Sequence, residues 1–98
     1  SKSCLLYLYN AVQVGEIRVG VNSDLTYGSA EITLLRMPEA FRKRFTPVWQ
    51  MKNADYLCYS YKNTPGNDYQ IPDFAVMKTF MVDGYAVMGV YQRINPAE

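Results

Sequence analysis

Alternating apolar and polar residues dominate the first third of the chain and predict β-strands there. In the clearest example, Ile17 and Val19 alternate with Glu16 and Arg18. Because successive side chains of a strand point to opposite faces, we expect the first pair to face a core and the second pair to face water. The same reasoning predicts three strands in this part of the chain, at residues 4–9, 16–21 and 29–35.

The pattern then changes and predicts one short helix over about residues 38–45. Pro38 suits the first position of a helix, and Glu39 behind it places negative charge near the positive end of the helix dipole. Phe41 and Phe45 are four residues apart, so both lie on one face of a helix. We expect these two rings to anchor the helix to a sheet.

Two more strands are predicted in the middle of the chain, at residues 48–51 and 56–62. A regular strand at 56–62 puts Leu57, Tyr59 and Tyr61 on one face and the residues between them on the other. The tyrosines of this segment therefore cannot all lie on one surface.

The last quarter of the chain predicts a long β-hairpin. Two runs of β-branched, aromatic and methionine residues, within 74–94, flank the dipeptide Asp83-Gly84. Asp-Gly favours a two-residue turn, which pairs Val82 with Tyr85. Both faces of this hairpin are largely apolar, whereas a surface hairpin is normally apolar on one face only. We therefore expect it either to lie between two layers or to keep one face for a partner.

Lys78 is the one charged residue within the first strand of this hairpin. A lysine on an edge strand discourages pairing with other chains. Its stem can also lie along apolar surface while its ammonium group sits over an aromatic ring, for which Tyr91 is the candidate.

Together these elements predict a single β-rich domain over residues 1–98. The fold class is mainly β, namely a six- or seven-stranded antiparallel sandwich or partly open barrel. It carries one short helix (about 38–45) and a long C-terminal hairpin that turns at 83–84. A chain of 98 residues can bury one modest core.

The charge is nearly balanced overall and uneven along the chain. The net charge is +1, so no strong global field attracts nucleic acid or anionic membranes. Residues 36–52 nevertheless carry a local charge of +4, which leaves −3 on the rest. The basic residues of this segment are Arg36, Arg42, Lys43, Arg44 and Lys52, against Glu39 alone.

Histidine is absent from the sequence. It is the commonest general base, the usual partner of serine and cysteine nucleophiles, and the commonest metal ligand. We therefore predict a protein without catalytic activity, and we expect no metal site and no cofactor. No apolar run approaches the roughly 20 residues needed to cross a bilayer, so we also expect no membrane span.

Cys4 and Cys58 lie in two different predicted strands. They would form a disulfide if those strands were neighbours and both side chains faced inward. We favour two buried free thiols, because unpaired cysteine commonly behaves as a small hydrophobic residue.

The leading functional hypothesis is a non-catalytic protein–protein interaction or assembly module. Self-association is the expected mode, as in a viral or phage structural component, and a small inhibitor protein also fits. Nine tyrosines support this view, because tyrosine is enriched at interfaces. The predicted contact surface is the methionine-rich face of the hairpin, since methionine adapts to partners. It comprises Met77, Thr79, Met81, Ala86, Met88 and Val90.

The alternative hypothesis is a small β-barrel that binds single-stranded nucleic acid. Its basic helix would hold phosphates, and exposed tyrosines would stack on bases. The residues concerned are Arg42, Lys43, Arg44, Lys52, Tyr59 and Tyr61. The near-zero net charge and the lack of a glycine-rich phosphate loop favour the first hypothesis.

Overall fold

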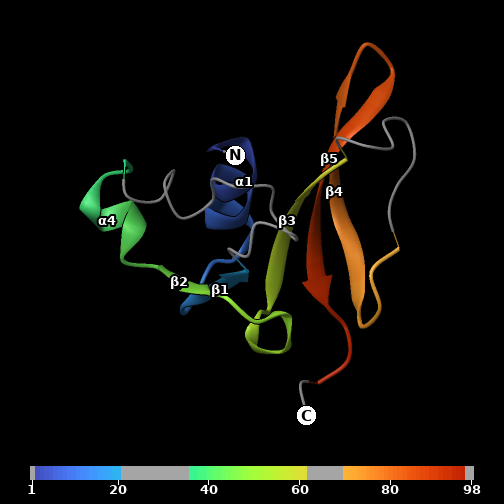
Figure 1. The fold of residues 1–98 in the computed structure, drawn as a ribbon. Helices are drawn as coiled ribbons and strands as arrows, with labels where there is room; N and C mark the ends of the chain where they lie inside the picture. Colours follow the sequence, from blue (N-terminus) through green and yellow to red (C-terminus); the bar gives the residue numbers. More distant parts are fainter. Residues whose placement is uncertain (1, 21–35, 62–69, 97–98) are drawn as a thin grey trace.

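The computed structural model describes residues 2–20, 36–61 and 70–96. These residues form α-helices, a short 3-10 helix and β-strands (Figure 1). In chain order the elements are α1 (Lys2–Ala11), β1 (Ile17–Gly20), α4 (Glu39–Arg42), β2 (Phe45–Val48), η1 (Met51–Asn53), β3 (Tyr56–Ser60), β4 (Phe74–Val82) and β5 (Tyr85–Arg93). The predicted strand at 29–35 lies outside the described residues.

The strands form one five-stranded sheet in the order β2-β1-β3-β5-β4. β1 runs parallel to both of its neighbours, whereas β5 is antiparallel to β3 and β4. The predicted mainly-β fold is therefore confirmed. The sheet is mixed rather than wholly antiparallel, and in the described residues β2 and β4 remain its two edges. Neither the predicted count of six or seven strands nor a sandwich or barrel is confirmed.

The predicted strand at 4–9 is wrong, because these residues belong to helix α1. The run from Leu5 to Tyr9 consists of leucine and tyrosine only, so strand alternation and a helical stripe cannot be told apart. In the helix, Cys4, Leu5 and Leu8 lie on the side that faces the sheet and are fully buried. Tertiary burial of this stripe thus decides the conformation.

The predicted strand at 16–21 is confirmed over Ile17–Gly20 as β1, with Ile17 and Val19 buried, and residue 21 lies outside the described residues. The predicted helix at 38–45 is shorter, because α4 ends at Arg42 and β2 begins at Phe45. Phe41 and Phe45 still act as anchors: both are buried, and their ring centroids lie 5.0 Å apart.

The strand predicted at 48–51 is displaced toward the N-terminus. The observed strand β2 contains Pro47, and Met51 belongs to η1. The predicted strand begins one residue after Pro47. β2 accommodates Pro47 because it is an edge strand, where a missing N–H group need not break a ladder.

The C-terminal hairpin is confirmed. Asp83 and Gly84 have φ angles of 50° and 83°, the two positive values that a type I′ turn requires. Val82 pairs with Tyr85, and farther from the turn Val76 pairs with Tyr91, as a two-residue turn dictates.

Between these points, two irregularities shift the register of the hairpin. A uniform register would pair Phe80 with Val87, but Phe80 lies opposite Met88 and Lys78 lies opposite Val90. Val87 in β5 and Met77 in β4 have no partner across the hairpin. Because one extra residue lies on each strand, the two bulges cancel and the register is restored at Val76.

Two apolar clusters lie on opposite faces of the sheet. Neighbouring residues of β3 belong to different clusters: Cys58 to the first and Leu57 to the second. The first cluster, on the side of α1, comprises Cys4, Leu5, Leu8, Ile17, Val19, Phe41, Phe45, Cys58 and Val90. The second comprises Ala54, Leu57, Tyr61, Ile71, Phe74, Ala86 and Tyr91. The hairpin contributes to both clusters, which explains why its sequence is apolar on both faces.

Cys4 of α1 and Cys58 of β3 form a disulfide, with their Cα atoms 6.0 Å apart. The prediction of two free thiols is therefore wrong. The bond forms because α1 packs across the sheet instead of joining it as a strand, which brings Cys4 over β3. Both cysteines are buried inside the first cluster, so the disulfide fixes the helix to the middle of the sheet.

Candidate functional site

The turn end of the hairpin exposes large apolar side chains. Met81 and Val82 are each 57% exposed, and Tyr85 is 60% exposed. Figure 1 shows this end of β4 and β5 extending beyond α1, α4 and the other strands. We call these three residues the hairpin tip.

The structure divides the predicted methionine-rich surface between the two faces of the sheet. Met77 and Met88 pack against the first cluster, to which buried Val90 belongs, whereas Ala86 is buried in the second. Met81 pairs with Ala86 and is exposed. The physical reason is the pair of bulges, because a one-residue slip turns a side chain to the other face. Of the six predicted residues, only Met81 also belongs to the hairpin tip.

The predicted phosphate-binding residue Arg44 is engaged at the end of helix α1. Its Nη2 donates hydrogen bonds to the carbonyl oxygens of Val12, at 2.6 Å, and Gly15, at 3.0 Å. Nη1 donates to the backbone carbonyl of Tyr9 at 3.3 Å, and the guanidinium also lies 5.4 Å from the centroid of the Tyr9 ring. A cation that binds carbonyls at a helix C-terminus stabilises the helix. Arg44 therefore has a structural role.

This role predicts a loss of stability when Arg44 is replaced by methionine. We expect Arg44→Met to lower the free energy of unfolding by about 1–2 kcal/mol, because several charge-assisted hydrogen bonds disappear while partial exposure lets water replace some of them. Lys43→Met removes the neighbouring exposed cation and should change it by less than about 0.5 kcal/mol. Urea unfolding followed by circular dichroism measures both. Equal stability of the two variants would contradict the capping role.

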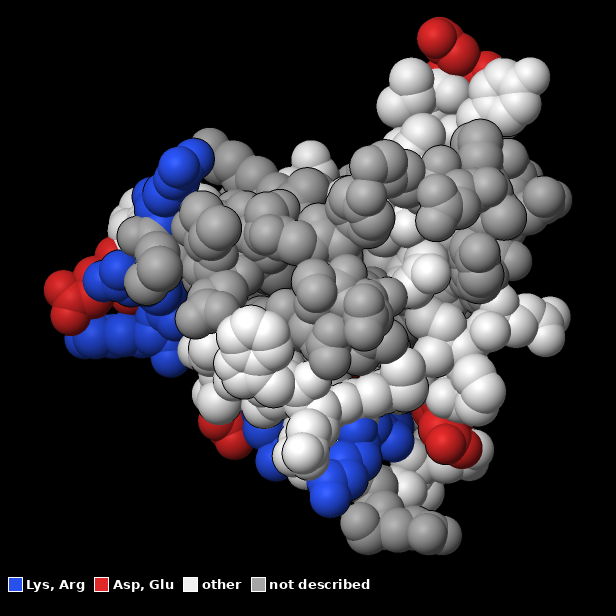
Figure 2. Space-filling view, in the orientation of Figure 1, with Lys and Arg blue, Asp and Glu red and all other residues white. Residues whose placement is uncertain are grey.

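The other predicted nucleic-acid contacts are scattered. Arg42 and Lys43 lie at α4, whereas Lys52 lies on η1 at the opposite end of β2. Tyr61 is only 1% exposed, and its hydroxyl lies 2.6 Å from that of Tyr91. Tyr61 is thus buried, contrary to the prediction, because its face of β3 is covered by the second cluster. Figure 2 shows lysine and arginine side chains in two separate groups, each with acidic side chains nearby. The structure does not assemble a continuous basic groove from these residues.

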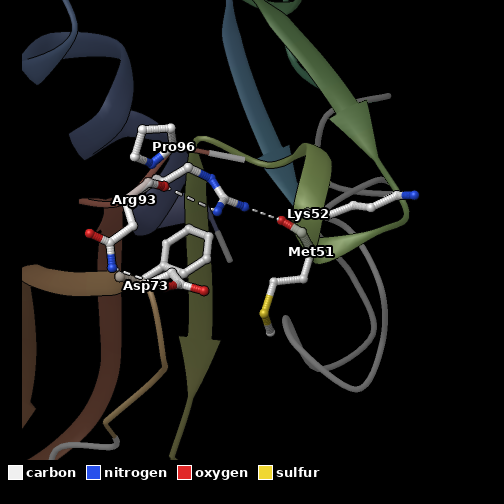
Figure 3. Close-up of a pocket in the computed structure, with 7 residues that line it drawn as sticks. Met51, Lys52, Asp73, Arg93 and Pro96 are labelled. Atoms are coloured by element: carbon white, nitrogen blue, oxygen red, sulfur yellow. Dashed lines mark hydrogen bonds between the residues drawn. The ribbon is translucent and has the colours of Figure 1, made fainter. Parts of the chain in front are cut away.

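A pocket of about 860 Å³ opens between η1 and the end of β5 (Figure 3). Arg93 lies at its wall, where Nε donates to the carbonyl of Ala54 at 2.8 Å and Nη2 donates to that of Met51. The guanidinium also lies 4.5 Å from the centroid of the Phe74 ring. These contacts tie η1 to β5. No sequence motif indicated this pocket, because its residues come from separate segments.

Asp73 and Asn95, which also line this pocket, hold the backbone in place. Asn95 Nδ2 donates to a carboxylate oxygen of Asp73 at 2.9 Å. The carbonyl of Asp73 accepts a hydrogen bond from the N–H of Ile94 at 2.8 Å. Figure 3 shows the Lys52 side chain directed away from the pocket. We assign this pocket a structural role, as the junction that holds the C-terminal segment against η1.

Arg18 and Asp55 form a salt bridge of 3.1 Å on the surface between β1 and β3. The hydrogen bond and the negative charge of Asp55 raise the pKa of Arg18 above its usual value.

Among residues 2–20, 36–61 and 70–96, no three His, Cys, Asp or Glu side chains come together in a way that could hold a metal ion. No helix in the described part of the chain is long and apolar enough to cross a membrane.

Comparisons with protein-family models, with curated proteins and with solved structures find no match to this chain.

Proposed function

We propose that this protein is a non-catalytic binding module that contacts another polypeptide through the hairpin tip. The observation that carries the proposal is the exposure of Met81, Val82 and Tyr85, each more than half accessible to solvent. Neighbouring exposed apolar groups of this kind mark interaction surfaces. Methionine and tyrosine are also enriched at protein interfaces.

The anchoring of the hairpin supports this proposal. β5 pairs with β3 along five residues, from Tyr56 to Ser60. Below the tip, Ala86, Val90 and Tyr91 are buried in the two clusters. A partner therefore meets a surface that is already held in place, so less conformational entropy is lost on binding than with a flexible loop.

The disulfide supports a proposal about where this binding takes place. Disulfides persist in oxidising surroundings and are rare in reducing compartments. Because Cys4–Cys58 links α1 to the sheet that carries the hairpin, we expect the protein to meet its partner in an oxidising compartment.

Selection from a library of random peptides displayed on phage tests the proposed surface. We expect the wild-type protein to enrich peptides whose binding weakens about tenfold with Met81→Lys or Tyr85→Lys, because either change puts a charge into an apolar contact. Isothermal titration calorimetry with the enriched peptides measures the change.

Ile94→Lys provides the matched control. Ile94 is an apolar residue that is 61% exposed, like the tip residues. It follows the end of β5 that lies away from the hairpin turn. This variant should bind the enriched peptides as the wild type does. Failure to enrich any peptide, or equal binding by wild type and the tip variants, would refute the proposed function.

A further inference from the structure

The two edges of the sheet differ in how well they are protected against pairing with another strand. β2 has four residues and includes Pro47, which has no N–H group to donate. β4 has nine residues and no proline. In the described residues no strand pairs with its outer side. Such an edge presents unpaired N–H and C=O groups and is a template for a further strand.

Apart from the bulge at Met77, β4 carries little of the usual protection against pairing with another strand. Val76 is 43% exposed and Met81 and Val82 are 57% exposed, so apolar groups reach solvent along the strand. Lys78 is its single charged residue. The Lys78 ammonium lies 5.7 Å from the centroid of the Phe80 ring, rather than over Tyr91 as predicted from the sequence.

A second copy of β4 fits this edge when the two strands run antiparallel about Thr79. In that register Lys78 of each copy lies opposite Phe80 of the other, so cations face aromatic rings instead of each other. Val76 of one copy approaches the Met81–Val82 end of the other, and the exposed apolar groups cover one another. A register centred on Lys78 would instead bring two like charges together.

We propose that two copies of this chain associate by antiparallel pairing of their β4 strands about a two-fold axis at Thr79. The pairing joins the two five-stranded sheets into one continuous sheet. A two-fold contact of this kind uses the same surface of both subunits and closes at the dimer. This inference rests on the proposed function, because it identifies the polypeptide that contacts the hairpin tip as a second copy of the same chain.

Opposite charges at position 79 test the pairing, because the axis places residue 79 of each copy beside its equivalent. Sedimentation equilibrium should show a dimer for the wild type. Thr79→Lys and Thr79→Glu should each dimerise roughly tenfold more weakly, since like charges meet at the axis. An equimolar mixture of the two variants should recover the association, because lysine then faces glutamate. Circular dichroism verifies that both variants are folded.

Amide hydrogen exchange of the wild-type protein reports on the backbone contact. Raising the protein concentration should slow the exchange of alternate β4 amides, those that point away from β5, and leave β2 amides unchanged. A wild type that stays monomeric, a mixture that associates no better than its components, or unchanged β4 exchange would overturn the inference. If one of these results is obtained and binding of the phage-selected peptides still depends on Met81 and Tyr85, the dimer is rejected while the proposed function stands.

Discussion

Removing the Cys4–Cys58 disulfide is expected to lower the free energy of unfolding by about 4 kcal/mol. The two cysteines are separated by 54 residues, and a cross-link that closes a loop of this length greatly reduces the conformational entropy of the unfolded chain. Domains of this size are commonly stable by only about 5–15 kcal/mol, so the loss is a large part of the total. Urea unfolding of Cys4→Ala/Cys58→Ala under non-reducing conditions measures it.

Three controls distinguish the cross-link from the packing of the sulfur atoms. Cys58→Ala alone should cost nearly as much as the double variant, because either change opens the loop. Treatment of the wild type with a phosphine reductant should produce a similar loss. Thiol titration of the denatured, unreduced protein should find no free thiol. Two titratable thiols, or an unfolding midpoint that does not change, would contradict the bond.

Gly89→Ala is expected to destabilise the protein by about 2–3 kcal/mol, although alanine is normally the better residue in a strand. A Cβ atom at position 89 would collide with the hydroxyl of Tyr61 and lie 2.9 Å from the ring of Tyr91. Overpacking a core costs about 1–3 kcal/mol, which outweighs the roughly 0.5–1 kcal/mol that replacing a flexible glycine can contribute. Thermal unfolding followed by circular dichroism measures the net change in stability that these two effects produce.

Tyr61→Phe shows whether this collision is the cause. Because the tyrosine hydroxyl is the nearest atom to the new methyl group, Gly89→Ala should cost less in the Tyr61→Phe protein than in the wild type. The double-mutant cycle should give a coupling of about 1 kcal/mol or more between the two positions. Strictly additive effects would mean that Gly89 is required for another reason.

The elements that the sequence predicted correctly are those whose signals are local. Asp83-Gly84 specifies its own turn through positive φ angles, and the alternation around Ile17 and Val19 matches a half-buried strand. The run at residues 4–9 failed because leucine and tyrosine fit both periods. Its helical form depends on contacts with the distant strands β1, β3 and β5, which no local pattern contains.

The residues of the predicted contact surface lie on two faces of the sheet, for a related reason. Alternation along an ideal hairpin placed Met81 and Met88 on one face, and the structure exposes the first and packs the second against the cluster under α1. The bulge at Val87, which lies between the Met81–Ala86 pair and the Phe80–Met88 pair, produces this difference. The basic segment likewise predicted a ligand site at Arg44, whereas the carbonyls of Tyr9 and Val12 take up its guanidinium.

By itself, the sequence determined the mainly-β composition, the long hairpin with its turn and the amphipathic strand β1, because short-range backbone preferences and side-chain alternation are sufficient for these. Only the tertiary structure decided that residues 2–11 form a helix, that Cys4 meets Cys58, and that β4 is an edge of the sheet that the described residues form. Each of these depends on which distant segments come together. The energy of such contacts is shared between segments and cannot be read from either one alone.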